Sequence, residues 1–351
     1  MLNLKRKATV LAFVLIISLT TQACSLTESG AAEKPSSEFP PASNSWTRVT
    51  ESAAYPGGYN FPVFVADNQM WAFHFDNVWH STDARKWTKA KLPSVRHNAY
   101  ESRYIQFNNA VYALGDNQGN YVDGIKFGSS IRRTTDFERW EVLSGKSNLP
   151  NRIFYGSTVF NGKIWIFGGF DGKNYYNDVW NSVDGVRWTR VSDRAAWSPR
   201  NVGHIGNAVV FRNRIWIVGG GVIDGDPKNN PKSDDEIWSS ADGIKWTLET
   251  DKSNISAGTP IVFDDKLWLV GANRGDGNFA RSSLVTNDGV NWREESAPWS
   301  PRGYVAAWIF DNKLYITGGK YSMTENGKIR FIYSNDVWFM TATPRNVALL
   351  R

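Results

Sequence analysis

The chain has 351 residues, of which 41% are hydrophobic and 21% charged, and this composition excludes a wholly disordered protein. Its formal net charge of +6 is the balance of 40 basic and 34 acidic residues. Three basic residues lie together near the start (Lys5, Arg6 and Lys7), and the others are interspersed with acidic ones, so no basic stripe indicates nucleic-acid binding. The 17 Trp fit either an aromatic binding surface or a repeated packing residue.

The first 23 residues predict export from the cell. Lys5-Arg6-Lys7 precede an apolar run over residues 8–19, and the run leads to TTQAC, which ends at Cys24. The segment is similar to a bacterial lipoprotein signal, and this resemblance implies cleavage before Cys24 and lipidation of its thiol. The alternative is ordinary signal-peptide cleavage at the same bond, after Ala23, without lipidation. We expect an exported, membrane-anchored lipoprotein of a bacterial cell envelope, on its periplasmic or extracellular face.

Residues 24–43 are rich in Ser, Pro, Ala and Glu and have no hydrophobic periodicity, so they predict a flexible tether. Cys24 is the only cysteine, which excludes disulfides within the chain. The stability of the domain that follows must therefore come from packing.

Residues 44–343 contain six copies of one unit, and residues 344–351 form a short tail. The first signature of the unit is an apolar run after a two-residue turn, as in NGKIWIFGG from Asn161. The second is an NDVW-like segment, and the third has Asp four residues before Trp, as in SVDGVRW. The aromatic residues at the centre of the first signature are Trp71, Tyr112, Trp165, Trp216, Trp268 and Tyr315.

Each unit predicts four short strands, because turns of Asn, Asp and Gly adopt the positive φ that tight hairpins need. The sixth unit lacks the last strand, whereas SWTRV at residues 45–49 resembles RWTRV at residues 187–191. We therefore predict an all-β, six-bladed propeller of four-stranded blades, whose last blade is closed by the N-terminal strand.

The Gly-Gly doublets after the apolar run and the period of about 50 residues resemble kelch repeats. The chain is similar to kelch-repeat propellers of the galactose-oxidase type over residues 44–343. The copper site of galactose oxidase needs a Cys–Tyr crosslink, and Cys24 lies in the leader, so we expect no cofactor. His74, His80, His97 and His204 show no metal-ligand spacing, and we expect no metal site.

The Asp-x-x-x-Trp signature predicts a local structural role. Asp184, Asp242 and Asp288 are each followed by Gly, and their carboxylates can accept hydrogen bonds from backbone amides in the turn. Because this signature recurs in five units, it indicates framework rather than catalysis.

The resemblance to kelch propellers implies that the loops before the innermost strands and the loops after the Gly-Gly doublets share one face. Loops on a rigid scaffold often carry function, Arg binds carboxylates, and aromatic faces stack on sugars. The candidate ligand-binding residues on this face are Arg96, Arg152, Tyr155, Tyr175, Tyr176, Trp197, Arg200, His204, Arg274, Arg281, Trp299, Arg302, Tyr304 and Tyr321. The sequence leaves a second role open for the Arg residues, as framework groups that pair with backbone carbonyls. For Trp197 and Trp299 the sequence favours a framework role over contact with a ligand.

Two classes of function follow. The first is a binding module for a glycan, an acidic small molecule or a partner protein, and we favour it because no catalytic set is recognised. The second is a sugar-modifying enzyme on the same face. The chain is similar to periplasmic sialic-acid mutarotases and, less closely, to sialidases, and this resemblance would give His204 and Tyr304 an acid–base role. The sequence does not decide between enzyme and binder.

Overall fold

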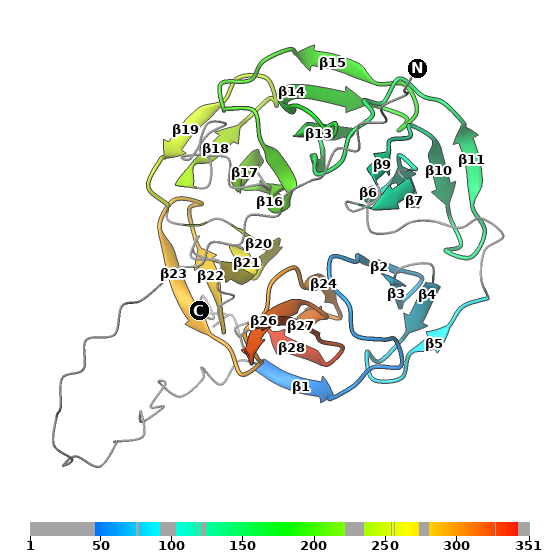
Figure 1. Cartoon of the computed structure of the whole chain (residues 1–351), viewed down its shortest axis with the longest axis vertical. Coiled ribbons are helices and arrows are strands. Elements are labelled where there is room, and N and C mark those ends of the chain that lie inside the picture. Colours follow the sequence, from blue (N-terminus) through cyan, green and yellow to red (C-terminus); the bar gives the residue numbers. More distant parts are fainter. Residues whose placement is uncertain are drawn as a thin grey trace, which may run out of the picture. The chain divides into compact units, whose positions relative to one another are not determined.

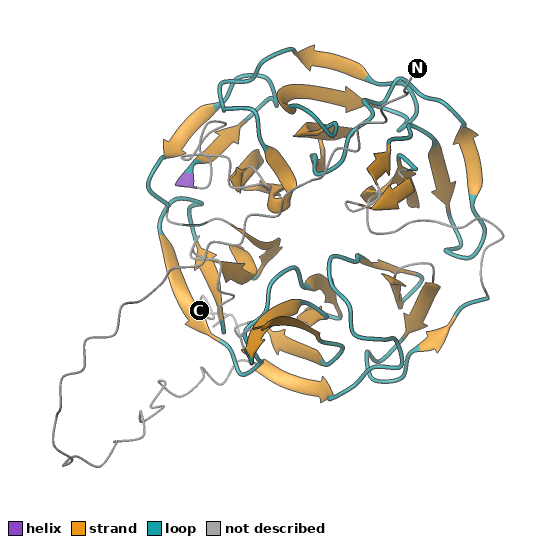
Figure 2. Ribbon diagram, viewed as in Figure 1, coloured by secondary structure: helices purple, strands orange, loops and turns teal. Residues whose placement is uncertain are grey.

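The computed structural model describes residues 46–74, 77–91, 103–116, 118–120, 124–221, 235–253, 255, 257–273, 281–326 and 328–342. The predicted signal peptide, Cys24, the tether and the tail lie outside the described residues. Six four-stranded antiparallel sheets form a ring of blades, which confirms the predicted six-bladed propeller (Figure 1; Figure 2). Within the described residues, no helix has the length and apolar character needed to cross a membrane.

The strands of each blade are given from the innermost outward. Blade 1 contains β2 (Val63–Ala66), β3 (Gln69–His74), β4 (Asn77–Ser81) and β5 (Thr88–Lys89). Blade 2 contains β6 (Arg103–Phe107), β7 (Ala110–Leu114), β10 (Ile131–Thr134) and β11 (Glu141–Ser144). Blade 3 contains β12 (Gly156–Phe160), β13 (Lys163–Phe170), β14 (Tyr175–Ser182) and β15 (Thr189–Ser192).

Blade 4 contains β16 (Asn201–Phe211), β17 (Arg214–Gly221), β18 (Ile237–Ser240) and β19 (Thr247–Thr250). Blade 5 contains β20 (Ala257–Phe263), β21 (Lys266–Asn273), β22 (Ser282–Thr286) and β23 (Trp292–Ser296). Blade 6 contains β24 (Ala306–Phe310), β25 (Lys313–Thr317), β28 (Val337–Thr341) and β1 (Trp46–Thr50). Two small hairpins, β8 (Gln118–Asn120) with β9 (Gly124–Lys126) and β26 (Lys320–Glu325) with β27 (Lys328–Tyr333), are inserted in blades 2 and 6.

The N-terminal strand closes the ring as predicted. β1 pairs antiparallel with β28, with Trp46 opposite Met340, and so supplies the outermost strand of blade 6. The Asn335 side-chain amide then donates hydrogen bonds to the carbonyls of Ala53 and Tyr55, at 3.1 and 3.0 Å. Asn177 of blade 3 makes the equivalent bonds to the loop after β15. The start and the end of the propeller are thus joined as consecutive blades are.

The predicted two-residue turns join the first and second strands of every blade. Asn161 and Gly162 have φ of 48° and 68°, and Asp311 and Asn312 have φ of 48° and 52°. Asn and Asp tolerate this left-handed conformation better than other non-Gly residues. The blade-2 segment without an NDVW motif still forms a third strand, which is β10.

The hydrophobic core lies between adjacent blades. Each cluster of buried residues draws on two neighbouring blades, as when Trp165 of blade 3 packs with Trp238 of blade 4. A Cβ on Gly243 would come within 2.4 Å of the Trp165 ring, so the glycine of the Asp turn leaves room for the Trp of the preceding blade. None of the 17 Trp is exposed, which identifies them as packing residues.

The Asp turns have the predicted structure. Asp184 accepts hydrogen bonds from the amides of Val186 and Arg187 at 2.9 and 2.8 Å, and Gly185 has φ of 74°. Burial alone raises the pKa of the Asp184 carboxyl, but these bonds, together with those from Ser182 and the Arg187 guanidinium, lower the pKa to about 2. The same amide bonds recur at Asp242 and Asp288.

Candidate functional site

Three of the predicted site residues, Arg152, Arg200 and Arg302, are buried, with exposed fractions of 7%, 0% and 1%. Arg152 makes a bidentate ion pair with Asp178, at 2.6 and 3.0 Å, and donates to the Gly168 carbonyl at 3.0 Å. Gly168 begins the Gly-Gly doublet of blade 3, and Asp178 belongs to its NDVW segment. The arginine thus ties together two of the three sequence signatures of its blade.

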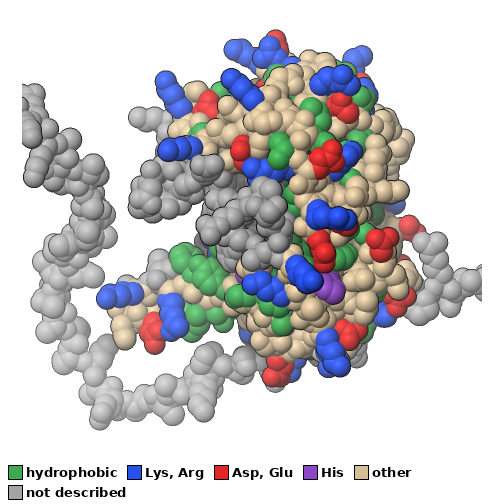
Figure 3. Space-filling view, turned by 90° about the vertical axis from the view of Figure 1, so that its right-hand side faces the viewer, with side chains coloured by type: hydrophobic (Ala, Val, Ile, Leu, Met, Phe, Trp, Pro, Cys, Tyr) green, Lys and Arg blue, Asp and Glu red, His purple; other side chains and the backbone are tan. Residues whose placement is uncertain are grey.

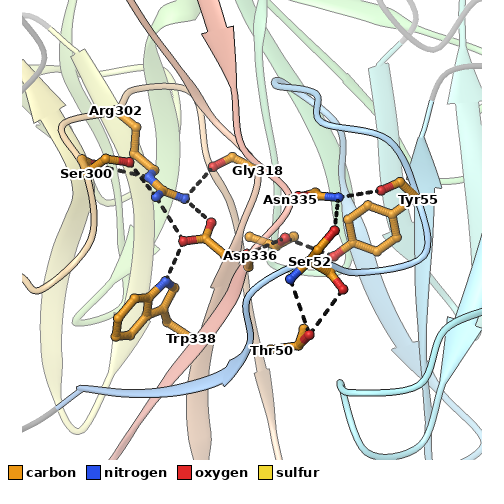
Figure 4. Close-up of polar contacts among 10 residues, drawn as sticks. Thr50, Ser52, Tyr55, Ser300, Arg302, Gly318, Asn335, Asp336 and Trp338 are labelled. Atoms are coloured by element: carbon orange, nitrogen blue, oxygen red, sulfur yellow. Dashed lines mark hydrogen bonds and ion pairs between the residues drawn. The ribbon is translucent and has the colours of Figure 1, made fainter.

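Blade 6 repeats the arrangement (Figure 4). Arg302 pairs with both carboxylate oxygens of Asp336 and donates to the carbonyls of Ser300 and Gly318, at 3.1 and 3.2 Å. The Trp338 indole donates to the same Asp336 carboxylate at 2.8 Å. Every charge in the set has a partner within the fold.

In blade 4 a glutamate takes the place of the aspartate that pairs with the arginine in blades 3 and 6. Arg200 pairs with Glu236, which also accepts a hydrogen bond from the Trp238 indole at 2.9 Å. Of the two roles that the sequence leaves open for these arginines, the buried ion pairs favour the framework role. Trp197 and Trp299, each 1% exposed, likewise pack in the core between blades.

The other predicted residues differ in their placement. Tyr155 is buried, and its hydroxyl donates to the Leu114 carbonyl at 3.0 Å, so it links blades 2 and 3. Tyr176 is half-buried, and its hydroxyl donates to Asp171 at 2.5 Å while the Arg152 guanidinium lies 4.0 Å from its ring centroid. Tyr175 is half-buried against Phe170, with ring centroids 4.7 Å apart.

The remaining candidates are Arg281, which is exposed, and Tyr321 and Tyr304, which are half-buried. Arg96 and Arg274 lie outside the described residues, and His204 lies in β16 with only its backbone described. Among the described residues, no group of three or more His, Cys, Asp and Glu is placed to hold a metal ion.

One group of polar and aromatic side chains remains accessible where blade 6 meets blade 1. We call it the Tyr–Lys cluster, and it comprises Tyr59, Tyr304, Lys320, Phe331 and Tyr333. The Lys320 ammonium lies 4.4, 5.2 and 5.2 Å from the ring centroids of Tyr59, Tyr304 and Phe331. The Tyr59 ring also stacks on Tyr333, with centroids 5.6 Å apart and planes 15° apart. Aromatic faces attract a cation because of their quadrupole.

The backbone explains how these residues meet. Gly303 and Lys320 form an antiparallel bridge, which brings Tyr304, just before β24, next to the start of β26. The Asn60 amide donates to the Tyr304 carbonyl at 2.9 Å, and this bond fixes the loop that carries Tyr59. In the β26–β27 hairpin Lys320 lies opposite Tyr333 and Ser322 opposite Phe331, so Lys320, Phe331 and Tyr333 share one face.

The cluster is open to solvent on the hairpin side. Phe331 and Tyr333 are 49% and 46% exposed. Figure 3, which views the ring from the side, shows hydrophobic and basic side chains, with an acidic one among them, on the part that projects at its lower left. Burial lowers the pKa of the Lys320 amine and raises the pKa of the Tyr304 phenol to about 12, so Tyr304 stays protonated at neutral pH.

Sequence reasoning identified Tyr304 but missed Tyr59, Lys320, Phe331 and Tyr333. Lys320 directly follows the Gly-Gly doublet of blade 6, at the position that Phe170 occupies in blade 3, and a basic residue at this variable position was the available signal. Tyr59 precedes the first recognised apolar run, so no repeat pattern marked it.

Comparison with known proteins agrees with this architecture. Residues 151–181 match the family model described as "Kelch motif", and this segment contains Arg152, Gly168 and Asp178. Kelch domain-containing protein 10 of Homo sapiens is 24% identical over 178 residues, which are 47% of this chain and 36% of that protein. Spermatocyte protein spe-26 of Caenorhabditis elegans is 26% identical over 204 residues, which are 57% of this chain and 35% of that protein.

The chain thus spans little more than a third of the length of these curated relatives. A solved structure titled "Structure of YjhT" matches with a TM-score of 0.61 and 15% sequence identity, and the match covers 85% of this chain and 98% of that one. At this identity the likeness shows the shared fold alone.

Proposed function

We propose that the protein is a lipid-anchored binding module of a cell envelope, which holds a glycan, an acidic small molecule or a partner protein on the propeller face that carries the Tyr–Lys cluster. The observation that carries this proposal is the cluster itself: a half-buried cation among aromatic rings, two of which are about half exposed. Tyrosine and phenylalanine in such settings supply large contact areas at low entropic cost.

The rest of the face supports the same choice. Arg152, Arg200 and Arg302, which would be the obvious anion receptors, are already paired within their blades. Because a buried pair cannot release its arginine without leaving a carboxylate uncompensated, these residues hold the loops in place rather than contact a ligand. Among the described candidates this leaves, besides the cluster, the exposed Arg281 and the half-buried Tyr175, Tyr176 and Tyr321 as accessible groups.

An enzymatic function finds less support among the described residues. Burial raises the pKa of the Tyr304 phenol to about 12, which disfavours this group as a general base at neutral pH. Binding needs no titrating group and agrees with the arrangement as it stands.

The test is a binding screen of the whole mature protein on arrays of glycans and small organic acids, together with a search for captured envelope proteins that are then purified and titrated. Tyr59→Ala should reduce binding of any hit at least tenfold. Lys163→Met is the matched control, because Lys163 begins β13 at the end of the blade opposite the Gly-Gly doublet. A hit that survives Tyr59→Ala in the folded protein, or one that depends on Lys163, would contradict the proposed face.

A further inference from the structure

Lys320 occupies the position directly after the Gly-Gly doublet of blade 6, where the residue type varies from blade to blade. Both Lys320 and Phe170 follow a Gly-Gly doublet, and each forms the same isolated bridge, to Gly303 and Ile153 respectively. In blade 3 the position is therefore filled by an apolar ring. In blade 4 the same position is Gly221, so the packing of the blades does not require an amino group there.

The ammonium group also lacks the carboxylate partner that three buried arginines of this face possess. Arg152, Arg200 and Arg302 each pair with a carboxylate, whereas no carboxylate among the described residues lies within ion-pair distance of Lys320. Its neighbours are the rings of Tyr59, Tyr304 and Phe331. Aromatic faces offset part of the cost of removing the charge from water, but an anion would offset more of it.

The surroundings indicate what kind of anion fits. A phosphate is usually held by several donors, such as Arg forks or consecutive backbone amides, and here one ammonium group faces aromatic surface. A carboxylate needs fewer donors. The stacked rings of Tyr59 and Tyr333, the latter 46% exposed, add a flat surface that suits a second ring.

We infer that the Tyr–Lys cluster binds a small ligand whose carboxylate is attached to a ring, with Lys320 pairing with the carboxylate and the exposed tyrosine and phenylalanine faces packing on the ring. This inference rests on the proposed binding function and narrows it to one chemical class. A sugar ring and a flat aromatic ring share this chemistry, and the experiment distinguishes them.

The test is isothermal titration of the whole mature protein with two pairs of probes, glucuronate against glucose and benzoate against benzyl alcohol. The expected result is that at least one acid binds at least tenfold more tightly than its neutral counterpart. Lys320→Met should abolish that preference and Lys320→Arg should keep most of it, since Arg restores the charge. Lys328→Met is the matched control, because Lys328 is an exposed lysine of the same hairpin whose side chain lies on the opposite face.

A second readout excludes a merely structural role for Lys320. NMR of the protein with 13C-labelled lysine should show the pKa of the Lys320 amine rising when the acid is bound, because a paired anion favours the charged form. Equal affinity for acid and neutral probes, or an unchanged preference in folded Lys320→Met, would overturn the inference. If neither acid binds to folded protein, the inference is also overturned. A neutral glycan that binds and is lost in Tyr59→Ala would still uphold the proposed function.

Discussion

Replacing Arg302 with Ala should destabilise the propeller strongly without involving any ligand. The change removes both bonds to Asp336 and the donors to the carbonyls of Ser300 and Gly318. Asp336 then keeps the Trp338 indole but loses its buried counter-charge. Breaking a buried pair by removing one partner costs about 3–5 kcal/mol, a large part of the roughly 5–15 kcal/mol that stabilises a typical domain.

The assay is urea unfolding followed by tryptophan fluorescence, with Arg330→Ala as the matched control. Arg330 has a side chain that is 70% exposed and lies 3.8 Å from Glu325, so its loss should cost at most about 1 kcal/mol. The double variant Arg302→Met with Asp336→Leu should recover part of the lost stability, because it leaves no unpaired charge. If the unfolding free energy of Arg302→Ala lies within about 1 kcal/mol of the wild-type value, the framework role of this arginine is refuted.

Three further predictions concern closure, acid sensitivity and the anchor. Trp46→Ala should cost about 3–5 kcal/mol in unfolding free energy, because it empties a core site where the centroids of the Trp46 and Trp299 rings lie 4.5 Å apart. The control Thr47→Ala, at the exposed neighbouring position of the same strand, should stay close to wild type. Burial lowers the pKa of His74 to about 4, so between pH 6.5 and 4 the unfolded chain binds a proton that the folded chain does not. As the pH is lowered through this range, the free energy of unfolding should therefore fall by up to about 1.4 kcal/mol per pH unit. His74→Phe should flatten that slope in pH-dependent melting, and an unchanged slope would contradict the assignment. Mass spectrometry of the mature N-terminus should find lipid on Cys24 and none after Cys24→Ser; an unmodified Cys24 would remove the anchor from the account.

Local signals made most of the fold predictable from the sequence. The turn at Asn161-Gly162 is predictable, because its residues are those that tolerate positive φ, and the structure confirms the turn. The likeness of SWTRV to RWTRV likewise revealed the closing strand. β10 escaped the motif analysis because its sequence, IRRT, lacks the NDVW signature of the third strands, although it pairs with β7 and β11 like them.

The candidate site was less predictable, because it depends on which residues the ring brings together. The pairing of Arg152 with Asp178 requires the Gly-Gly doublet and the NDVW segment to flank the same arginine, and no linear pattern states this. Tyr59 and Lys320 stand near opposite ends of the propeller sequence, and they meet only because blade 6 closes against blade 1. Local composition therefore singled out loops of this face and left two roles open for their arginines, and only the fold shows that three of them are paired within their blades.

The most direct test of the central claim, that the Tyr–Lys cluster is the recognition site, is the ratio of dissociation constants between Lys320→Met and the wild type for the tightest-binding ring carboxylate. The account predicts a ratio of at least ten, with Lys328→Met near one and the fold unchanged in near-ultraviolet circular dichroism. A ratio near one for folded Lys320→Met would place recognition elsewhere on the protein.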